Sequence, residues 1–165
     1  MSLCINKDFT QIDEHLWLGS SDVMSDVGHS FVLAYDIRLV INCAIEIEYR
    51  NEAIPVLNIP FQDDKSQQLW PDICIASHLI EATTILGHNV YVHCAAGISR
   101  SPAVIIYHFM RTKNISFDLA YKLVKQKRNI ISLNDGFINQ LKSIDVGIIP
   151  KDRPIPFKFD SVCKM

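Results

Sequence analysis

A strand, a tight loop and a helix start follow one another without a gap between residues 89 and 102. Residues 89–92 are mostly β-branched and aromatic, which predicts a buried strand. At the far end, Ser101 and Pro102 predict a helix N-terminus with Ser101 as its N-cap. Loop amides and the positive end of a helix dipole attract an anion. The run therefore predicts an anion site at the carboxyl end of a strand in an α/β fold.

The loop itself, residues 93–101, carries a nucleophile and a fixed cation. Cys94 and Arg100 reach one phosphate only if the loop curls, and Gly97 permits the positive φ that curling needs. A cysteine at a helix N-terminus beside an arginine is a thiolate that can attack a phosphate ester. The Arg100 fork matches two phosphoryl oxygens, and Ser101 can donate a hydrogen bond to the departing sulfur. The alternative is a buried cysteine with unrelated neighbours. It would require the glycine, arginine and serine to stand at these spacings from Cys94 by chance.

The motif His-Cys-x-x-Gly-x-x-Arg-Ser is the signature loop of cysteine-dependent protein tyrosine phosphatases, and residues 96–101 resemble its dual-specificity branch. Outside the loop, the similarity is carried by residues 12–20, 39–44 and 134–141. The resemblance to a small atypical dual-specificity phosphatase implies an α/β fold with a central mixed β-sheet flanked by helices. It also implies hydrolysis of phosphotyrosine and phosphoserine/threonine esters through a cysteinyl-phosphate intermediate, with no metal or cofactor.

The family pattern implies a role for each residue of the loop. Cys94 is the nucleophile, Arg100 binds phosphate and stabilises the transition state, and Ser101 stabilises the leaving thiolate. The substrate-binding residues are Ala95, Ala96, Gly97, Ile98 and Ser99. His93 orients the loop through backbone hydrogen bonds. Asn134 supports the loop, although this chain lacks the proline that usually precedes that asparagine.

A phosphatase of this kind also needs a general acid, because an alkoxide or phenolate leaves readily only when it is protonated. The resemblance places the acid on the loop that follows Ile59 and Pro60, where Asp63 best matches its position. Asp64 is the neighbouring alternative. Without the family, two aspartates before a polar stretch indicate a solvated turn. We expect Asp63 to protonate the leaving group and then to activate the water that hydrolyses the thiophosphate.

Periodicity and capping residues predict the order of the secondary structure. Strands are expected at residues 11–13, 16–18, 40–42, 56–59 and 89–93. Helices are expected at residues 20–28, 30–35, 71–86, 101–112, 116–127 and 134–146. Ser116 and Asn134 are the expected N-caps of the last two helices. Residues 1–148 are expected to form one catalytic domain, and residues 149–165 an extended C-terminal tail that contains three prolines.

The composition is ordinary for one globular domain. The 165 residues are 48% hydrophobic and 21% charged, with a net charge of −2 and no basic stretch that indicates nucleic-acid binding. The basic cluster 122–128 has helical spacing, which predicts a solvated helix face; a patch that faces a phosphopeptide or a membrane is the alternative. The cysteines are scattered and the sequence shows no signal segment, which predicts a cytoplasmic or nuclear protein. It also shows no uncharged stretch of transmembrane length, so we expect no stable membrane anchor.

Other substrates and a non-catalytic function are the alternatives. A phosphoinositide site would gain from lysines in the loop, where Ala95, Ala96 and Ile98 are neutral, and an RNA 5′-end phosphatase would need a basic groove. A catalytically weak, phosphopeptide-binding relative typically lacks the cysteine or the arginine, and both are present here. We therefore expect phosphoprotein substrates.

Four side chains have both a structural and a functional interpretation. Cys43 ends a strand expected beside that of Cys94, so it is either a core residue or the partner of an oxidised Cys94 in a disulfide. Trp70 and Phe137 either pack in the core or line the approach to the site. Gln140 either positions water or holds structure. The structural interpretation is the simpler one for each of them.

Overall fold

The computed structural model describes residues 8–24, 28–48, 55–144 and 147. Its strands are β1 (Phe9–Asp13), β2 (Leu16–Ser20), β3 (Ile37–Ala44), β4 (Val56–Phe61) and β5 (Asn89–Cys94). Each contains one of the predicted strands, and most are two or more residues longer. Strand pairing extends them: Gly19, for example, shows no apolar alternation but pairs with Phe9 on β1 and His93 on β5.

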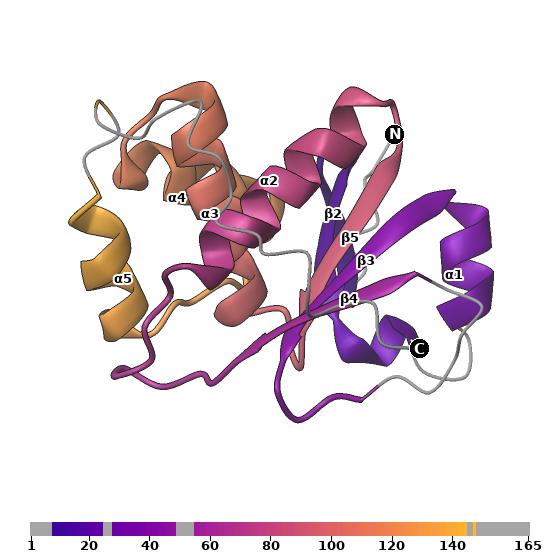
Figure 1. The fold of residues 1–165 in the computed structure, drawn as a ribbon, viewed down its shortest axis with the longest axis horizontal. Coiled ribbons are helices and arrows are strands. Elements are labelled where there is room, and N and C mark those ends of the chain that lie inside the picture. The colour runs from indigo at the N-terminus through magenta and orange to yellow at the C-terminus, as the bar shows by residue number, and fades with distance from the viewer. Residues whose placement is uncertain (1–7, 25–27, 49–54, 145–146, 148–165) are drawn as a thin grey trace, which may run out of the picture.

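The strands form one sheet in the order β1-β2-β5-β3-β4, which occupies the middle of the molecule (Figure 1). β1 runs antiparallel to β2, whereas β2, β5, β3 and β4 are parallel to their neighbours. The expected central mixed sheet flanked by helices is confirmed. β5 is the central strand, and its Cys94 lies in register with Ser20 at the end of β2.

Helices cover both faces of the sheet. They are the 3₁₀ helix η1 (Ser21–Met24) and the α-helices α1 (Gly28–Ala34), α2 (Asp72–Ile85), α3 (Arg100–Lys113), α4 (Phe117–Lys127) and α5 (Asp135–Lys142). Both expected N-caps are confirmed: the side chain of Ser116 accepts from Leu119 N, and that of Asn134 accepts from Phe137 N over 3.0 Å. Gly87 follows α2 with a φ of 76°, as expected of a glycine past a helix end.

Two helix predictions were too long. A helix over 20–28 was expected, but the chain makes only the 3₁₀ turn η1, which buries Val23 and Met24; residues 25–27 lie outside the described ranges. α5 ends at Lys142 rather than at 146. The next hydrogen bond, from Ile144 N to Leu141 O, spans three residues as in a 3₁₀ turn and not four as in an α-helix. The expected tail, 149–165, also lies outside the described residues.

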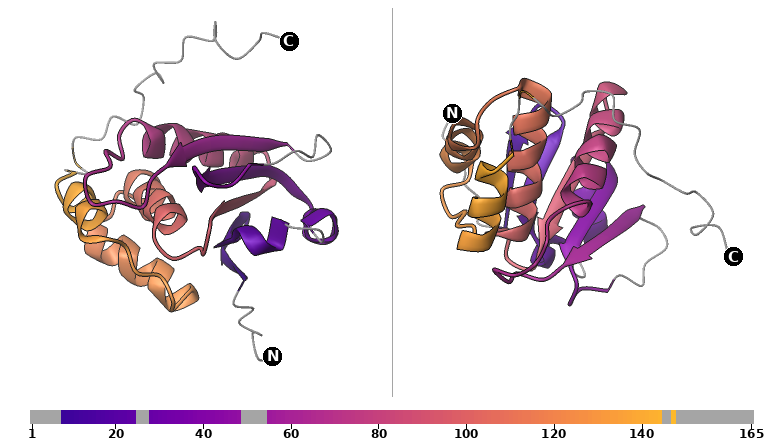
Figure 2. Two further views of the ribbon diagram at one scale, coloured as in Figure 1. Left: turned by 90° about the horizontal axis from the view of Figure 1, so that it is seen from below. Right: turned by 60° about the vertical axis from the view of Figure 1, so that its left-hand side comes forward.

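Successive strand residues point into two separate cores. Ile41 and Val92 contribute to the large core beneath α2 and α3, whereas Val40 and Tyr91 face the smaller core beneath η1 and α1. In Figure 2, α2, α3, α4 and α5 lie on one side of the sheet and α1 on the other. Because β5 is packed on both faces, its carboxyl end is buried where the chain approaches α3. No helix within the described ranges is long and apolar enough to cross a membrane.

Two histidines buried in this fold make its stability depend on pH. Burial lowers the pKa of His93 on β5 and of His108 on α3 to about 4. An unfolded histidine titrates near 6.5, so the unfolded chain binds protons that the folded chain excludes. The contribution of each histidine to the free energy of unfolding is therefore complete above pH 6.5 and is lost as the pH falls to 4. We expect the free energy of unfolding to fall by up to about 3 kcal/mol per histidine.

Urea unfolding at pH 7 and at pH 4.5 tests this expectation. His108→Asn should lose less stability on acidification than the unmodified chain. The exposed His88 provides the matched control, because His88→Asn should leave the pH dependence unchanged. An identical pH dependence in all three proteins would contradict the role of burial.

Candidate active site

Helix α3 begins two residues earlier than the sequence predicted. Ala103 N donates to Ser99 O over 3.0 Å, so Ser99 is the N-cap and Arg100 the first helical residue. The prediction of Ser101 as N-cap was wrong. The Ser101 hydroxyl bonds to the Cys94 sulfur instead. Pro102 still fits, because a backbone N–H is not needed in the first turn of a helix.

The loop between β5 and α3, which we call the phosphate loop, has four successive carbonyls that accept hydrogen bonds from other segments. The donors are Ser21 N and Oγ to Ala95 O (3.1 and 3.2 Å), Arg128 Nη2 to Ala96 O (3.4 Å), Arg128 Nε to Gly97 O (3.0 Å) and Ser132 N to Ile98 O (2.8 Å). A trans peptide points its carbonyl and the following N–H in opposite directions. The amides of residues 96–99 therefore face into the loop, an arrangement that can hold an anion, and we refer to these four amides as the cradle.

Gly97 is the residue at which the loop turns. Its φ is 65°, which confirms the expected positive φ. A Cβ at this position would lie 2.5 Å from Gly19 O and 3.0 Å from Arg128 Nη2. The loop therefore packs tightly against the end of β2 on one side and the buried Arg128 on the other. A side chain at position 97 would break both contacts.

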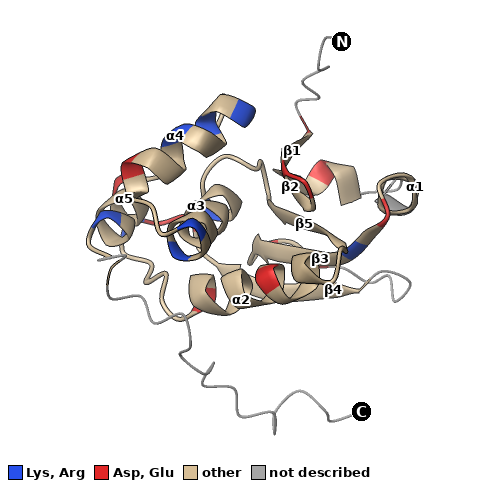
Figure 3. Ribbon diagram, turned by 90° about the horizontal axis from the view of Figure 1, so that it is seen from above, with Lys and Arg blue, Asp and Glu red and all other residues tan. Residues whose placement is uncertain are grey.

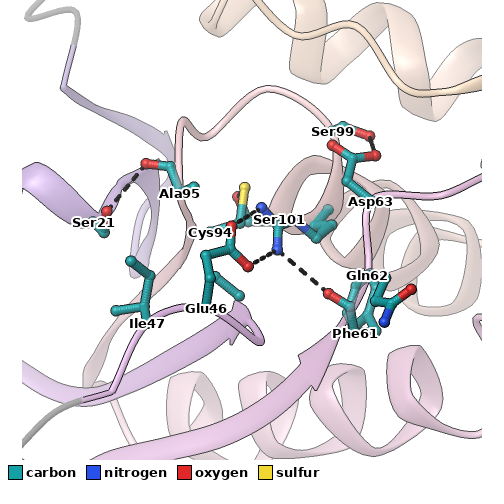
Figure 4. A network of polar contacts seen from close by, with 12 residues as sticks. Ser21, Glu46, Ile47, Phe61, Gln62, Asp63, Cys94, Ala95, Ser99 and Ser101 are labelled. Atoms are coloured by element: carbon teal, nitrogen blue, oxygen red, sulfur yellow. Dashed lines mark hydrogen bonds and ion pairs between the residues drawn. The ribbon is translucent and has the colours of Figure 1, made fainter.

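Cys94 lies at the floor of this cradle (Figure 4), where β5 ends, and only 2% of its surface is exposed. Ser101 Oγ donates to Cys94 Sγ over 3.2 Å. His93 Nδ1 lies 3.3 Å from Cys94 O, and because a carbonyl only accepts, this nitrogen carries the proton. Burial lowers the pKa of His93 to about 4, so the ring is neutral at physiological pH. His93 therefore contacts the loop as a hydrogen-bond donor and not as a cation.

Arg100 is held by a carboxylate that the sequence analysis missed. Its Nη1 and Nη2 bind the two Glu46 oxygens over 2.6 and 2.5 Å, and Nη1 also reaches Phe61 O at 3.4 Å (Figure 4). These hydrogen bonds lower the pKa of Glu46 to about 2. Arg100 Nε is buried and has no hydrogen-bond partner among the described residues. The edge of the guanidinium formed by Nε and Nη2 therefore remains available to a ligand.

Asp63 approaches the cradle from the loop after β4. Its Oδ1 accepts hydrogen bonds from Ser99 Oγ at 2.7 Å and from Asn134 Nδ2 at 2.8 Å. Asp64 instead accepts from Ser66 N and Ser66 Oγ, and these bonds lower its pKa. The two aspartates thus differ: Asp63 is joined to the phosphate loop, whereas Asp64 closes a local turn.

Helix α5 fixes the loop that carries Asp63. A Cβ at Gly136 would lie 2.1 Å from Lys65 O, so the two backbones are in direct contact. Lys65 Nζ also pairs with Asp135 at 2.9 Å, and the Gln140 side chain bonds Leu69 N and Gln67 O. Gln140 therefore has the expected structural role. Through Asn134 and Gly136, one helix N-terminus positions the whole loop.

The structure also shows the surroundings of the other three side chains for which the sequence allowed two interpretations. Phe137 is fully buried against Phe61, which confirms a core position. Trp70 is half exposed and packs edge-on against Tyr107, so the prediction of a core position was wrong for this residue. Cys43 is completely buried on β3, next to β5, and burial raises the pKa of its thiol. This is the environment of a core cysteine, and a disulfide with Cys94 remains an untested hypothesis.

The basic cluster 122–128 is not a uniform solvated face. Lys122 and Lys127 are exposed, and basic residues gather at the C-terminal end of α4 in Figure 3. Arg128, however, is only 1% exposed and points behind the phosphate loop. Helical spacing could not reveal this, because Arg128 follows the helix and other segments cover it. The prediction of a solvated face was wrong for Arg128.

Comparisons with other proteins identify the family. The family model of the dual specificity phosphatase catalytic domain matches residues 16–145. "Putative tyrosine phosphatase 123R" of Invertebrate iridescent virus 6 is 37% identical over 143 residues, which is 82% of this chain and 91% of that protein. "Dual specificity protein phosphatase 8" of Mus musculus is 34% identical over 138 residues, but the match covers 80% of this chain and only 20% of the mouse protein.

Solved structures show the same fold. The human tyrosine phosphatase-like serine/threonine/tyrosine-interacting protein superposes with a TM-score of 0.76 at 24% identity, over 83% of this chain and 95% of that one. The PTP-2 phosphatase of Cydia pomonella superposes with a TM-score of 0.72 at 26% identity, over 82% and 89%. With the family match across most of its length, the chain belongs to the dual specificity phosphatases and contains their catalytic domain, a phosphoric monoester hydrolase.

Proposed function

We propose that this protein removes phosphate from phosphotyrosine and phosphoserine/threonine in proteins through a cysteinyl-phosphate intermediate. The observation that carries the proposal is the position of Cys94 beneath four inward-facing amides, with Arg100 and Asp63 at the same loop. The amides and Arg100 would hold the three non-bridging phosphoryl oxygens, and the thiolate would lie in line with the ester bond. Arg100 would use its Nε and Nη2 edge, while Glu46 keeps the other edge.

In the first step, the Cys94 thiolate attacks phosphorus, so that a sulfur–phosphorus bond forms as the ester oxygen–phosphorus bond breaks. Asp63 donates its proton to the leaving oxygen. Both hydrogen bonds to Asp63 described above end on Oδ1, which leaves Oδ2 to carry that proton. Asp63 becomes a carboxylate as the alcohol or phenol departs.

In the second step, Asp63 takes a proton from a water molecule, whose oxygen attacks the cysteinyl phosphate. The sulfur–phosphorus bond breaks, inorganic phosphate forms, and Cys94 leaves as a thiolate. Ser101 Oγ, which donates to Cys94 Sγ over 3.2 Å, stabilises the leaving sulfur. Each proton and electron pair is accounted for by the substrate, water and these side chains.

The neutral side chains of the loop support protein substrates. Ala95, Ala96 and Ile98 place no cation beside the cradle, and Arg128 is turned away from it and buried. A second phosphate on an inositol ring would therefore find no charged partner from these residues. A phosphoinositide and an RNA 5′ end remain the alternative substrates. The alternative function is binding of phosphopeptides without turnover.

Substitution of the nucleophile and of the acid tests the mechanism. Cys94→Ser should abolish hydrolysis of p-nitrophenyl phosphate, and Asp63→Asn should lower kcat about 100-fold, because acid catalysis contributes that much. Asp64→Asn is the matched control and should keep kcat within about twofold. The cysteinyl-phosphate mechanism fails if Cys94→Ser retains turnover. A larger effect at Asp64 than at Asp63 would move only the acid assignment.

Gly136→Ala tests whether α5 positions the acid loop. Alanine ordinarily stabilises a helix by about 1 kcal/mol relative to glycine. Here the new Cβ would meet Lys65 O, so we expect lower stability and a fall in kcat of about tenfold or more. Urea unfolding and steady-state kinetics measure the two effects. Asn139→Ala, at an exposed position on the same helix, should leave kcat unchanged without lowering stability. An unchanged kcat in Gly136→Ala would refute the positioning role.

A further inference from the structure

Arg128 is a buried cation that lies directly behind the phosphate loop. It follows α4, it is 1% exposed, and it is among the largest fully buried side chains of the molecule. Its Nε donates to Gly97 O at 3.0 Å, and its Nη2 reaches Ala96 O at 3.4 Å. Its Nη1 donates to Thr10 Oγ1 on β1 at 3.2 Å. One guanidinium thus joins the loop to the edge of the sheet.

These contacts bear on catalysis because of the peptides they hold. The carbonyls of Ala96 and Gly97 belong to the same peptide groups as the amides of Gly97 and Ile98. A carbonyl held by Arg128 keeps the following N–H turned toward the anion. If the carbonyl lost this partner, it could turn inward, where it would repel a phosphate. Arg128 therefore determines which side of two peptides the substrate meets.

We propose that Arg128 is a positioning residue of the active site, which holds two peptides of the phosphate loop with their amides inward. This inference rests on the proposed function. A residue in this place acts through the loop and not through contact with the phosphate, since Gly97 lies between them.

Arg111 offers a matched control for a substitution at Arg128. Its side chain is 3% exposed, and it donates to Ser77 and pairs with Glu81 at 2.6 Å. It lies near the other end of α3, about 16 Å along the helix from Arg100. Replacement of either arginine by methionine removes one buried guanidinium of similar size. Only the substitution at Arg128 removes it from the phosphate loop.

The experiment compares Arg128→Met and Arg111→Met in the full chain. Binding of inorganic phosphate, measured by titration calorimetry, is the readout beside kcat and urea unfolding. For Arg128→Met we expect about tenfold weaker phosphate binding and about tenfold lower kcat. Arg111→Met should be destabilised to a similar degree, but its phosphate binding and kcat should match those of the unmodified chain.

Arg128→Lys remains informative if the methionine variant does not fold. Lysine keeps the charge but cannot donate along two directions from one plane, so phosphate binding should again be about tenfold weaker. The proposal is overturned if Arg128 variants that fold bind phosphate as tightly as the unmodified chain. Phosphate binding does not require turnover, so this readout can fail separately from the proposed function.

Discussion

The active site depends on the orientation of four peptide groups between Ala95 and Ser99. A segment of five residues could place its carbonyls on either side of a curled loop, and only one of these arrangements leaves the amides facing inward. The donors that hold the carbonyls come from η1, from the segment after α4 and from the segment before α5. An anion cradle of neutral backbone groups is therefore produced by contacts on its outer side.

The groups that accompany the cradle are positioned in the same indirect way. Arg100 is oriented by Glu46, from the turn after β3, and Asp63 by Asn134, at the start of α5. The parallel strands β3, β4 and β5 bring their carboxyl ends to one edge, which places these loops within reach of one another. The cation, the proposed acid and the thiol thus come from separate elements and meet at that edge.

Local patterns predicted the elements well and the contacts between them poorly. All five strands, Gly97 and the caps Ser116 and Asn134 followed from short-range chemistry. The start of α3 was misplaced because a serine before a proline is a sound local cap, whereas the Ser101 hydroxyl binds sulfur in the folded chain. Arg128 was misplaced because the spacing of one helix does not reveal which other segments cover its end.

The sequence by itself determined that a thiol, a flexible turn, an arginine and a helix start follow a central strand, since these features are adjacent in the chain. Only the tertiary structure decided which side of the loop its amides face, which carboxylate holds Arg100, and that Asp63 rather than Asp64 joins the loop. The physical reason is that each of these depends on a hydrogen bond between residues 30 or more positions apart. Such partners are selected by packing, and local sequence patterns carry no record of them.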